Sequence, residues 1–326
     1  MKEQLINAVA CPLCRNKAEA KLWHVPNANF SSRIKAFDIV RCSGCGLYTM
    51  SPFPTIEDCK EIYVKENTFS KPRPWSYDRK AFYKILEPLH AKFGRHYIFA
   101  AKRCYQLAAE KKNPRVLDIG CSLGDLLKEF IAFNPNATVI GTDIDPNAKL
   151  RAYPGCAEHM IIDDFMTMTF DEKFDIIAMG FVIEHLLNLR EMVEKAVSLL
   201  KPGGILFLGT PDIGSPKAQQ LRDRWVLVHS PFEKIGHVCW FDTNSMQALA
   251  KMFGLEMADY RHVGELRFHL PLWLQKGLLK LFGTDPASGR FIKYYCLRLP
   301  WHIVFDSLLA RRLGYGECML AFLRKK

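Results

Sequence analysis

The fold of this 326-residue chain is constrained most by residues 115–127, which read Arg-Val-Leu-Asp-Ile-Gly-Cys-Ser-Leu-Gly-Asp-Leu-Leu. The apolar run 116–119 carries one acid, Asp118, and is followed by Gly120 and Gly124. An amphipathic run then begins, so the pattern predicts a buried strand, a tight glycine turn and the start of a helix. Glycine lets a backbone approach a ligand closely, and a helix start offers free N–H groups. We therefore expect a nucleotide-type cofactor over the first strand of a parallel sheet.

Four further apolar runs continue this rhythm, at 138–143, 159–162, 174–179 and 205–209, with a helical pattern over 189–200. Alternating strands and helices predict an α/β fold with a doubly wound, mostly parallel sheet. Asp143 ends the second strand, 25 positions after Asp118, where a carboxylate can accept both hydroxyls of a ribose. Asp164 and Phe165 follow the third strand, where an acid can bind an exocyclic amine and an aromatic ring can lie against adenine.

The motifs Leu-Asp-Ile-Gly-Cys-Ser-Leu-Gly, Gly-Thr-Asp, Phe-Asp-Ile-Ile, Glu-His-Leu and Leu-Leu-Lys-Pro-Gly-Gly occur in this order over about residues 114–260. In this, the chain resembles class I S-adenosylmethionine-dependent methyltransferases, which implies a Rossmann-like, seven-stranded sheet. The first turn reads Gly-x-x-x-Gly and not Gly-x-Gly-x-x-Gly, which argues against a dinucleotide enzyme. One departure is Ser122, where the family usually has glycine. The resemblance implies these cofactor-binding residues: Asp118, Gly120, Ser122 and Gly124 along the methionine, Asp143 and Ile144 at the ribose, Asp164 and Phe165 at the adenine, and Gly180 and Phe181 on the methyl side.

Glu184-His185 and the later segment Gly-His-Val-Cys-Trp-Phe at 236–241 are similar to those of the ubiquinone-pathway O-methyltransferases. Transfer of a methyl group to a hydroxyl requires removal of a proton, and histidine is the natural base near neutral pH. His185 and His237 are the candidates, and a structural role in binding backbone groups is the alternative for each. Glu184 is expected to orient one of them, or to bind a metal together with Asp212.

Two Cys-x-x-Cys pairs, Cys11 with Cys14 and Cys42 with Cys45, are separated by 27 residues. This spacing predicts a closed, tetrahedral, structural zinc site that folds a small amino-terminal zinc ribbon. Two unrelated buried pairs are the alternative, and a redox pair is disfavoured because the first pair does not lie at a strand–helix junction. An odd total of eleven cysteines without a secretion signal argues against a disulfide framework.

The predicted organisation is a zinc ribbon at 1–55, a helical linker and cofactor cover at 56–112, a methyltransferase core at 113–262, a helical insertion or lid at 263–313, and a last core strand at 314–326. In the cover, Tyr77, Arg79 and Tyr83 are candidates for the pocket. The formal charge is +11, and residues 261–326 hold twelve basic and four acidic side chains. This basic, aromatic tail is expected to pack as a lid, and contact with an anionic membrane surface is the next interpretation.

The sequence therefore predicts S-adenosylmethionine-dependent methyl transfer to a small molecule, on a hydroxyl of a sugar, a glycolipid headgroup or a quinone-like ring. One alternative is an RNA methyltransferase, although nucleic acid is disfavoured because the basic excess lies in the tail and not around the zinc site. Another is a non-catalytic scaffold that binds the cofactor. Without a signal peptide or an apolar run of about 20 residues, we expect a cytoplasmic protein, with peripheral contact to the inner face of the membrane as a further expectation.

Overall fold

The computed structural model describes residues 10–26, 28, 30–62, 96–108, 112–225, 227–228, 236–263 and 316–326. The chain forms two compact units, and nearly all of these residues belong to the unit made of residues 1–71, 96–261 and 318–326. The second unit comprises 72–95 and 262–317. Tyr77, Arg79, Tyr83 and the insertion expected after residue 263 lie outside the described residues, so the predictions made for them stay predictions.

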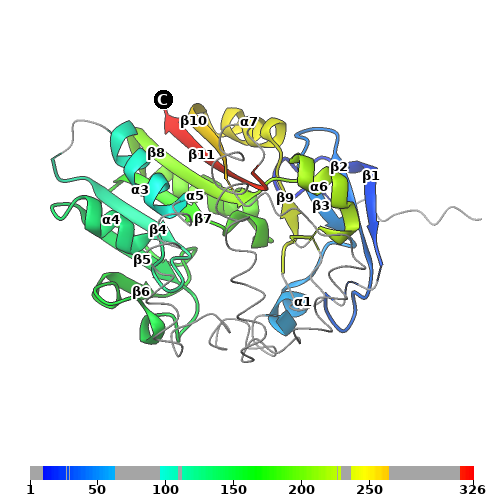
Figure 1. The fold of residues 1–326 in the computed structure, drawn as a ribbon, viewed down its shortest axis with the longest axis horizontal. Helices are drawn as coiled ribbons and strands as arrows, with labels where there is room; N and C mark the ends of the chain where they lie inside the picture. The colour runs from blue at the N-terminus through cyan, green and yellow to red at the C-terminus, as the bar shows by residue number, and fades with distance from the viewer. Residues whose placement is uncertain are drawn as a thin grey trace, which may run out of the picture. The chain divides into compact units, whose positions relative to one another are not determined.

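Seven strands of the described chain form one sheet in the order β10-β11-β8-β7-β4-β5-β6 (Figure 1). Strand β4 pairs in parallel with β5 and β7, β7 pairs in parallel with β8, and β11 runs antiparallel to β8. This is the doubly wound, Rossmann-like arrangement that the sequence predicted, including a last strand at the carboxyl terminus. The strands are β4 (Arg115–Ile119), β5 (Thr138–Asp143), β6 (Met160–Ile162), β7 (Phe174–Gly180), β8 (Leu200–Pro211), β10 (Leu255–Val263) and β11 (Cys318–Lys325).

The central strand β7 is buried from Phe174 to Met179, which explains why it reads as an unbroken apolar run. Strand β8 begins at Leu200 and not at residue 205, because Leu200 already pairs with Phe174. It ends at Pro211, because β11 pairs with it from Ile205 to Pro211. Pairing with strands distant in sequence therefore sets the length of β8, and local periodicity does not.

The helices of the core are α3 (His96–Leu107), α4 (Leu127–Phe133), α5 (Leu189–Leu199), α6 (Pro216–Leu221) and α7 (Thr243–Met252). Helix α5 buries Leu189, Met192, Val193 and Ala196, which lie three or four residues apart and so share one face. Helix α7 begins at Thr243, where Asp242 and Ser245 form a capping box. Short 3-10 helices occupy the loops: η2 (Lys149–Arg151), η3 (Ala157–His159), η4 (Ile183–His185) and η5 (Arg222–Arg224).

A second, antiparallel sheet has the order β1-β2-β3-β9, with β1 at Ala18–Val25, β2 at Phe37–Cys42, β3 at Tyr48–Ser51 and β9 at Cys239–Trp240. Helix α1 (Ile56–Lys60) follows it and begins with a Thr55–Asp58 capping box. The first three strands lie within residues 1–55, the part of the chain predicted to form the zinc ribbon. The fourth comes from the methyltransferase part of the chain, because β3 pairs with Trp240 and Cys239. One cluster of buried hydrophobic residues extends through both sheets.

Candidate functional site

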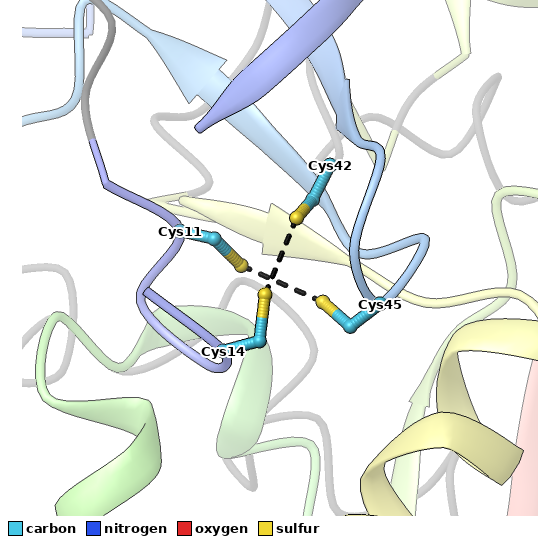
Figure 2. A group of neighbouring side chains, drawn as sticks. All are labelled: Cys11, Cys14, Cys42 and Cys45. Carbon is cyan, nitrogen blue, oxygen red and sulfur yellow. Dashed lines mark hydrogen bonds between the residues drawn. The ribbon is translucent and has the colours of Figure 1, made fainter. Parts of the chain in front are cut away.

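The four predicted zinc ligands converge on one point (Figure 2). Cys11 and Cys14 lie in the turn before β1, Cys42 ends β2, and Cys45 lies in the turn that follows. The sulfurs of Cys11 and Cys45 are 3.6 Å apart, those of Cys14 and Cys42 are 3.4 Å apart, and all four lie within 4.8 Å of one another. A tetrahedral Zn–S distance of about 2.3 Å separates the sulfurs by about 3.8 Å. The cluster therefore fits a zinc ion both in its donor atoms and in its size.

The electrostatics of the cluster point the same way. Hydrogen bonding from Cys45 lowers the pKa of Cys11 to about 5, although burial opposes the shift. Burial raises the pKa of Cys14 to about 11, and the Cys11 thiolate raises that of Cys45. Four neighbouring thiols thus ionise only in part without a cation, whereas a divalent metal allows all four to be thiolates.

Helix α5 fixes the first cysteine pair to the core. The backbone N–H of Arg190 donates to the carbonyl of Pro12 at 3.3 Å. The guanidinium Nη1 of the same arginine donates to the carbonyl of Leu13 at 3.1 Å. Arg15 forms an ion pair with Glu191 at 2.9 Å on the same helix. The cysteine turn is therefore attached to a helix of the methyltransferase sheet, and a metal held there would stabilise both.

The glycine turn after β4 has the geometry that the sequence predicted. The N–H groups of Gly120 and Cys121 donate to the carbonyl of Thr142 at 2.7 and 3.0 Å, which ties the turn to β5. Gly120 has a φ of +70°, and a Cβ there would lie 2.6 Å from Val182 Cγ2. Ser122 has a φ of +49°, in the left-handed region that favours glycine. This explains why glycine is usual at that position, and the turn nevertheless keeps its shape with serine.

Asp143 connects the turn to the end of β5. Its Oδ2 accepts the Ser122 N–H and its Oδ1 accepts the Asp145 N–H, both at 2.8 Å. Each carboxylate oxygen retains a second acceptor position, so the side chain is oriented and can still bind hydroxyl groups. Burial raises the pKa of Asp143, and the two N–H donors oppose that rise.

Asp118, near the carboxyl end of β4, is only 3% exposed. Its pKa is raised well above the usual range by burial and by repulsion from Asp143 and Asp125. Three acids thus lie close together, two at the carboxyl ends of neighbouring strands and Asp125 just before helix α4. Their shared repulsion would be relieved by a cationic ligand, and burial would strengthen that attraction.

At the next loop, the structure separates two residues that the sequence placed together. Asp164 is exposed, and its Oδ1 accepts the N–H of Met166 at 2.8 Å. The Phe165 side chain is 3% exposed and packs against Phe170 with 6.3 Å between ring centroids. The ring belongs to the core because apolar neighbours surround it there, and its expected contact with adenine stays a prediction. Ile144 is 73% exposed beside Asp143, as a ligand contact at this edge requires.

Gly180 and Phe181 end β7 and meet helix α3. Phe181 has a φ of +60°, and its N–H donates to the carbonyl of Gly209 at 2.7 Å. Its ring lies edge-on to those of His96 and Tyr97, at 5.9 and 6.2 Å. Burial lowers the pKa of His96. The sequence did not predict His96 and Tyr97 at this site, because their signal in it is only a His-Tyr pair in the helical stretch before β4.

Glu184, His185 and His237 come together although 51 residues separate the histidines. Three potential ligand atoms, one from each side chain, lie within 4.8 Å of one another, and the two imidazole centroids are 4.7 Å apart. The Val238 N–H donates to the Glu184 carbonyl at 2.8 Å, which holds the second segment beside η4. His185 Nδ1 lies 3.1 Å from the Gly236 carbonyl, and His237 Nδ1 lies 2.8 Å from the Leu227 carbonyl. A carbonyl only accepts, so each Nδ1 carries the proton and each Nε2 carries the lone pair.

All three side chains of this group are uncharged near neutral pH. Burial raises the pKa of Glu184 to about 8 and lowers that of His185 to about 4. The pKa of His237 falls well below its usual value through burial and through His185. Glu184 is 0% exposed, and among the described residues neither of its carboxyl oxygens has a hydrogen-bond partner. Asp212 is not part of this group, and its Oδ1 accepts the Gly214 N–H at 2.8 Å.

Comparison with known proteins gives the family. A family described as "Methyltransferase domain" matches residues 91–260, about half of the chain. The chain belongs to this methyltransferase family. Among curated relatives, it is 36% identical over 107 residues to the ubiquinone biosynthesis O-methyltransferase of Glaesserella parasuis, covering 29% of this chain and 44% of that one. The corresponding protein of Mesorhizobium japonicum is 37% identical over 136 residues, covering 39% and 49%. The chain thus spans less than half the length of these relatives.

A putative sarcosine dimethylglycine methyltransferase from Galdieria sulphuraria is a similar solved structure, with 17% identity, a TM-score of 0.46 and coverage of 71% of this chain and 85% of that one. A putative methyltransferase from Bacillus halodurans has 19% identity, a TM-score of 0.42 and coverage of 69% and 98%.

In the described part of the chain, no helix has both the length and the apolar character needed to cross a bilayer.

Proposed function

We propose that this methyltransferase-family chain binds S-adenosylmethionine over the turn between β4 and α4 and transfers its methyl group to a hydroxyl of a small molecule. The observation that carries the proposal is the grouping of Asp118 and Asp143 at the ends of β4 and β5. Asp143 is oriented by two backbone N–H groups, and Asp118 is a buried acid whose pKa is raised by its acidic neighbours.

Each part of the cofactor has a group suited to it. The cofactor carries a sulfonium and an ammonium, and their positive charges would favour the ionised forms of the acids around Gly120 and Gly124 and be attracted to them. The remaining acceptor positions of Asp143 suit the ribose hydroxyls. Ile144 supplies an exposed apolar face, and Asp164 supplies an acceptor for the adenine amine. Gly180 and Phe181, with His96 and Tyr97 beside them, would border the methyl side.

When bound, the cofactor supplies an electrophilic methyl group for in-line displacement by the acceptor oxygen. The protein has to take the hydroxyl proton, and the lone pair on Nε2 of His185 or His237 can accept it. Both imidazoles are neutral at physiological pH because their pKa values are lowered, so neither needs to lose a proton first.

We infer further that zinc in the Cys11, Cys14, Cys42 and Cys45 cluster is structural. Four thiolates fill all four positions of a tetrahedral ion and leave none for a substrate. The names of the curated relatives support a hydroxyl on a quinone-like ring as acceptor, and a sugar or glycolipid headgroup hydroxyl remains a prediction from the sequence. Cytoplasmic location and contact with a membrane surface also stay predictions.

The test is methyl transfer from tritium-labelled S-adenosylmethionine by the zinc-loaded chain into separated lipid, carbohydrate and RNA extracts. We expect label in the lipid or carbohydrate fraction, and label in RNA alone would contradict the proposed acceptor class. The His185→Asn and His237→Asn variants should both retain cofactor binding, and the one that loses transfer identifies the base. The matched control is His24→Asn, because His24 is an exposed histidine of β1 that pairs with Asp38.

A further inference from the structure

Lys195, in the middle of helix α5, binds the loop that follows β6. Its ammonium donates to three backbone carbonyls, those of Phe165 at 2.6 Å, Met166 at 2.9 Å and Met168 at 2.6 Å. The same nitrogen lies 4.9 Å from the centroid of the Phe165 ring. Among the described residues no carboxylate forms an ion pair with Lys195, so backbone oxygens and one aromatic face are the partners of this charge.

The three carbonyls belong to a single turn. The N–H groups of Thr167 and Met168 both donate to the carbonyl of Asp164, at 3.0 and 3.2 Å. The side chain of Asp164 is held at the start of this turn, because its Oδ1 accepts the Met166 N–H at 2.8 Å. The backbone N–H of Asp164 donates to Asp163 Oδ1 at 2.7 Å. The position of the Asp164 carboxylate is therefore set by the turn, and the turn is set in part by Lys195.

The convergence of the carbonyls requires a cation. Three carbonyl dipoles that point their negative ends at one site repel one another, and a single ammonium with three donors satisfies them all. A neutral side chain at position 195 would leave these oxygens facing each other or facing water, and the turn would relax. The change would reach Asp164 first, since the turn begins there.

We propose that Lys195 is a positioning residue for adenine recognition, holding Asp164 where its carboxylate accepts a hydrogen bond from the 6-amino group of the base. This inference rests on the proposed function, because it concerns the same cofactor. Lys195 does not have to touch the cofactor in order to affect its binding. Its effect on binding passes through Asp164, which gives it a signature that a general loss of stability does not have.

The signature is discrimination between a 6-amino and a 6-oxo base. Calorimetry on the zinc-loaded chain would compare S-adenosylhomocysteine with S-inosylhomocysteine, which presents a carbonyl where adenine has its amine. A hydrogen bond to a charged acceptor favours the amine by about tenfold or more. We expect that preference in the wild type and its loss in Lys195→Met. Lys195→Arg, which keeps a cation with several donors, should restore part of it.

The matched control is Lys251→Met, the same substitution at an exposed position of helix α7, which should keep the wild-type ratio. Lys195→Met should also have no further effect on the ratio in an Asp164→Ala background, since both changes remove one interaction. If Lys195→Met does not fold, Lys195→Gln provides the same comparison with a neutral donor and should likewise lose the preference.

Two outcomes overturn the inference separately from the proposed function. A wild type that prefers the amine, together with a Lys195→Met variant that keeps the full preference, refutes the role of Lys195 alone. Additive effects of Lys195→Met and Asp164→Ala on the ratio refute it as well. A correctly folded wild type that binds neither ligand refutes the proposed function, and the role of Lys195 falls with it.

Discussion

Replacing Glu184 by glutamine should make the protein more stable at alkaline pH and change its pH dependence in a defined direction. Glu184 is fully buried, and its pKa rises from 4.5 in the unfolded chain to about 8 in the folded one. The folded state therefore binds more protons than the unfolded state between these values. The free energy of unfolding of the wild type therefore falls as the pH rises through this window. That of Glu184→Gln does not fall for this reason, because glutamine has the same shape and stays neutral.

The magnitude follows from the two pKa values. The difference between the two pKa values lowers the free energy of unfolding by about 1 kcal/mol at pH 5 and by about 4 kcal/mol at pH 8, because in this range the carboxyl ionises readily only in the unfolded chain. The variant should therefore gain about 3 kcal/mol relative to the wild type over this range. Urea unfolding of both zinc-loaded proteins, at half-unit steps of pH, measures the difference directly. The control is Glu256→Gln, an exposed position of β10, which should give a constant difference.

Parallel stability curves for the wild type and Glu184→Gln would refute this reasoning. They would show that Glu184 is ionised in the folded protein over the whole range, as a carboxylate bound to a cation would be. The assignment of an uncharged group formed by Glu184, His185 and His237 would then be wrong.

Three further predictions follow from the same structure. Removing zinc by chelation, or by Cys45→Ser, should lower the unfolding free energy by at least about 4 kcal/mol when free zinc exceeds its Kd a thousandfold; metal analysis should return one zinc per chain, and an unchanged unfolding midpoint would contradict the cluster. Gly120→Ala should cost about 1 to 3 kcal/mol more than Gly203→Ala, because both have a φ near +70° but only the first Cβ would meet Val182; equal losses in urea unfolding would contradict the close contact. Methyl transfer should stay constant as the pH falls through 6.5, because the pKa of His185 is lowered to about 4 and its lone pair remains available; a fall centred near 6.5 in the pH–rate profile would contradict His185 as base.

Features encoded by local pattern could be predicted from the sequence. The strand, glycine turn and helix start at residues 115–127 follow from apolar periodicity and two glycines, and the structure has β4, the turn and α4 there. The zinc cluster follows from the spacing of two cysteine pairs, because each pair needs only a short turn to bring its sulfurs together. The glycine turn depends on contacts within a few residues, whereas the two cysteine pairs meet across 27 intervening residues, and the pattern of each pair is the local signal for that meeting.

Features that depend on distant pairing could not be predicted. Strand β9 completes the zinc-ribbon sheet through Trp240 and Cys239, and a two-residue strand carries no periodicity. The inward position of Phe165 is set by Phe170 and Lys195, and an aromatic next to an acid reads the same whether it faces a ligand or the core. His96 was missed because its importance comes from packing against Phe181.

The candidate base group lies between these cases. The sequence predicts two separate candidate bases, His185 next to Glu184 and the distant His237, with a structural role as the alternative for each histidine. Their meeting depends on the backbone bond from Val238 to Glu184 and on the carbonyls of Gly236 and Leu227. These bonds also supply the structural role that was the alternative, so each histidine binds backbone through Nδ1 and retains Nε2 for chemistry.

Calorimetric titration of the zinc-loaded chain with S-adenosylhomocysteine tests whether the turn between β4 and α4 binds the cofactor. The wild type should bind one molecule per chain, and Asp143→Ala should abolish binding because the oriented ribose acceptor is lost. Asp171→Ala, at an exposed acid in the loop before β7, should bind as the wild type does. Equal affinity for the wild type and Asp143→Ala, or no binding by a folded wild type, would contradict the assignment of this turn as the cofactor site.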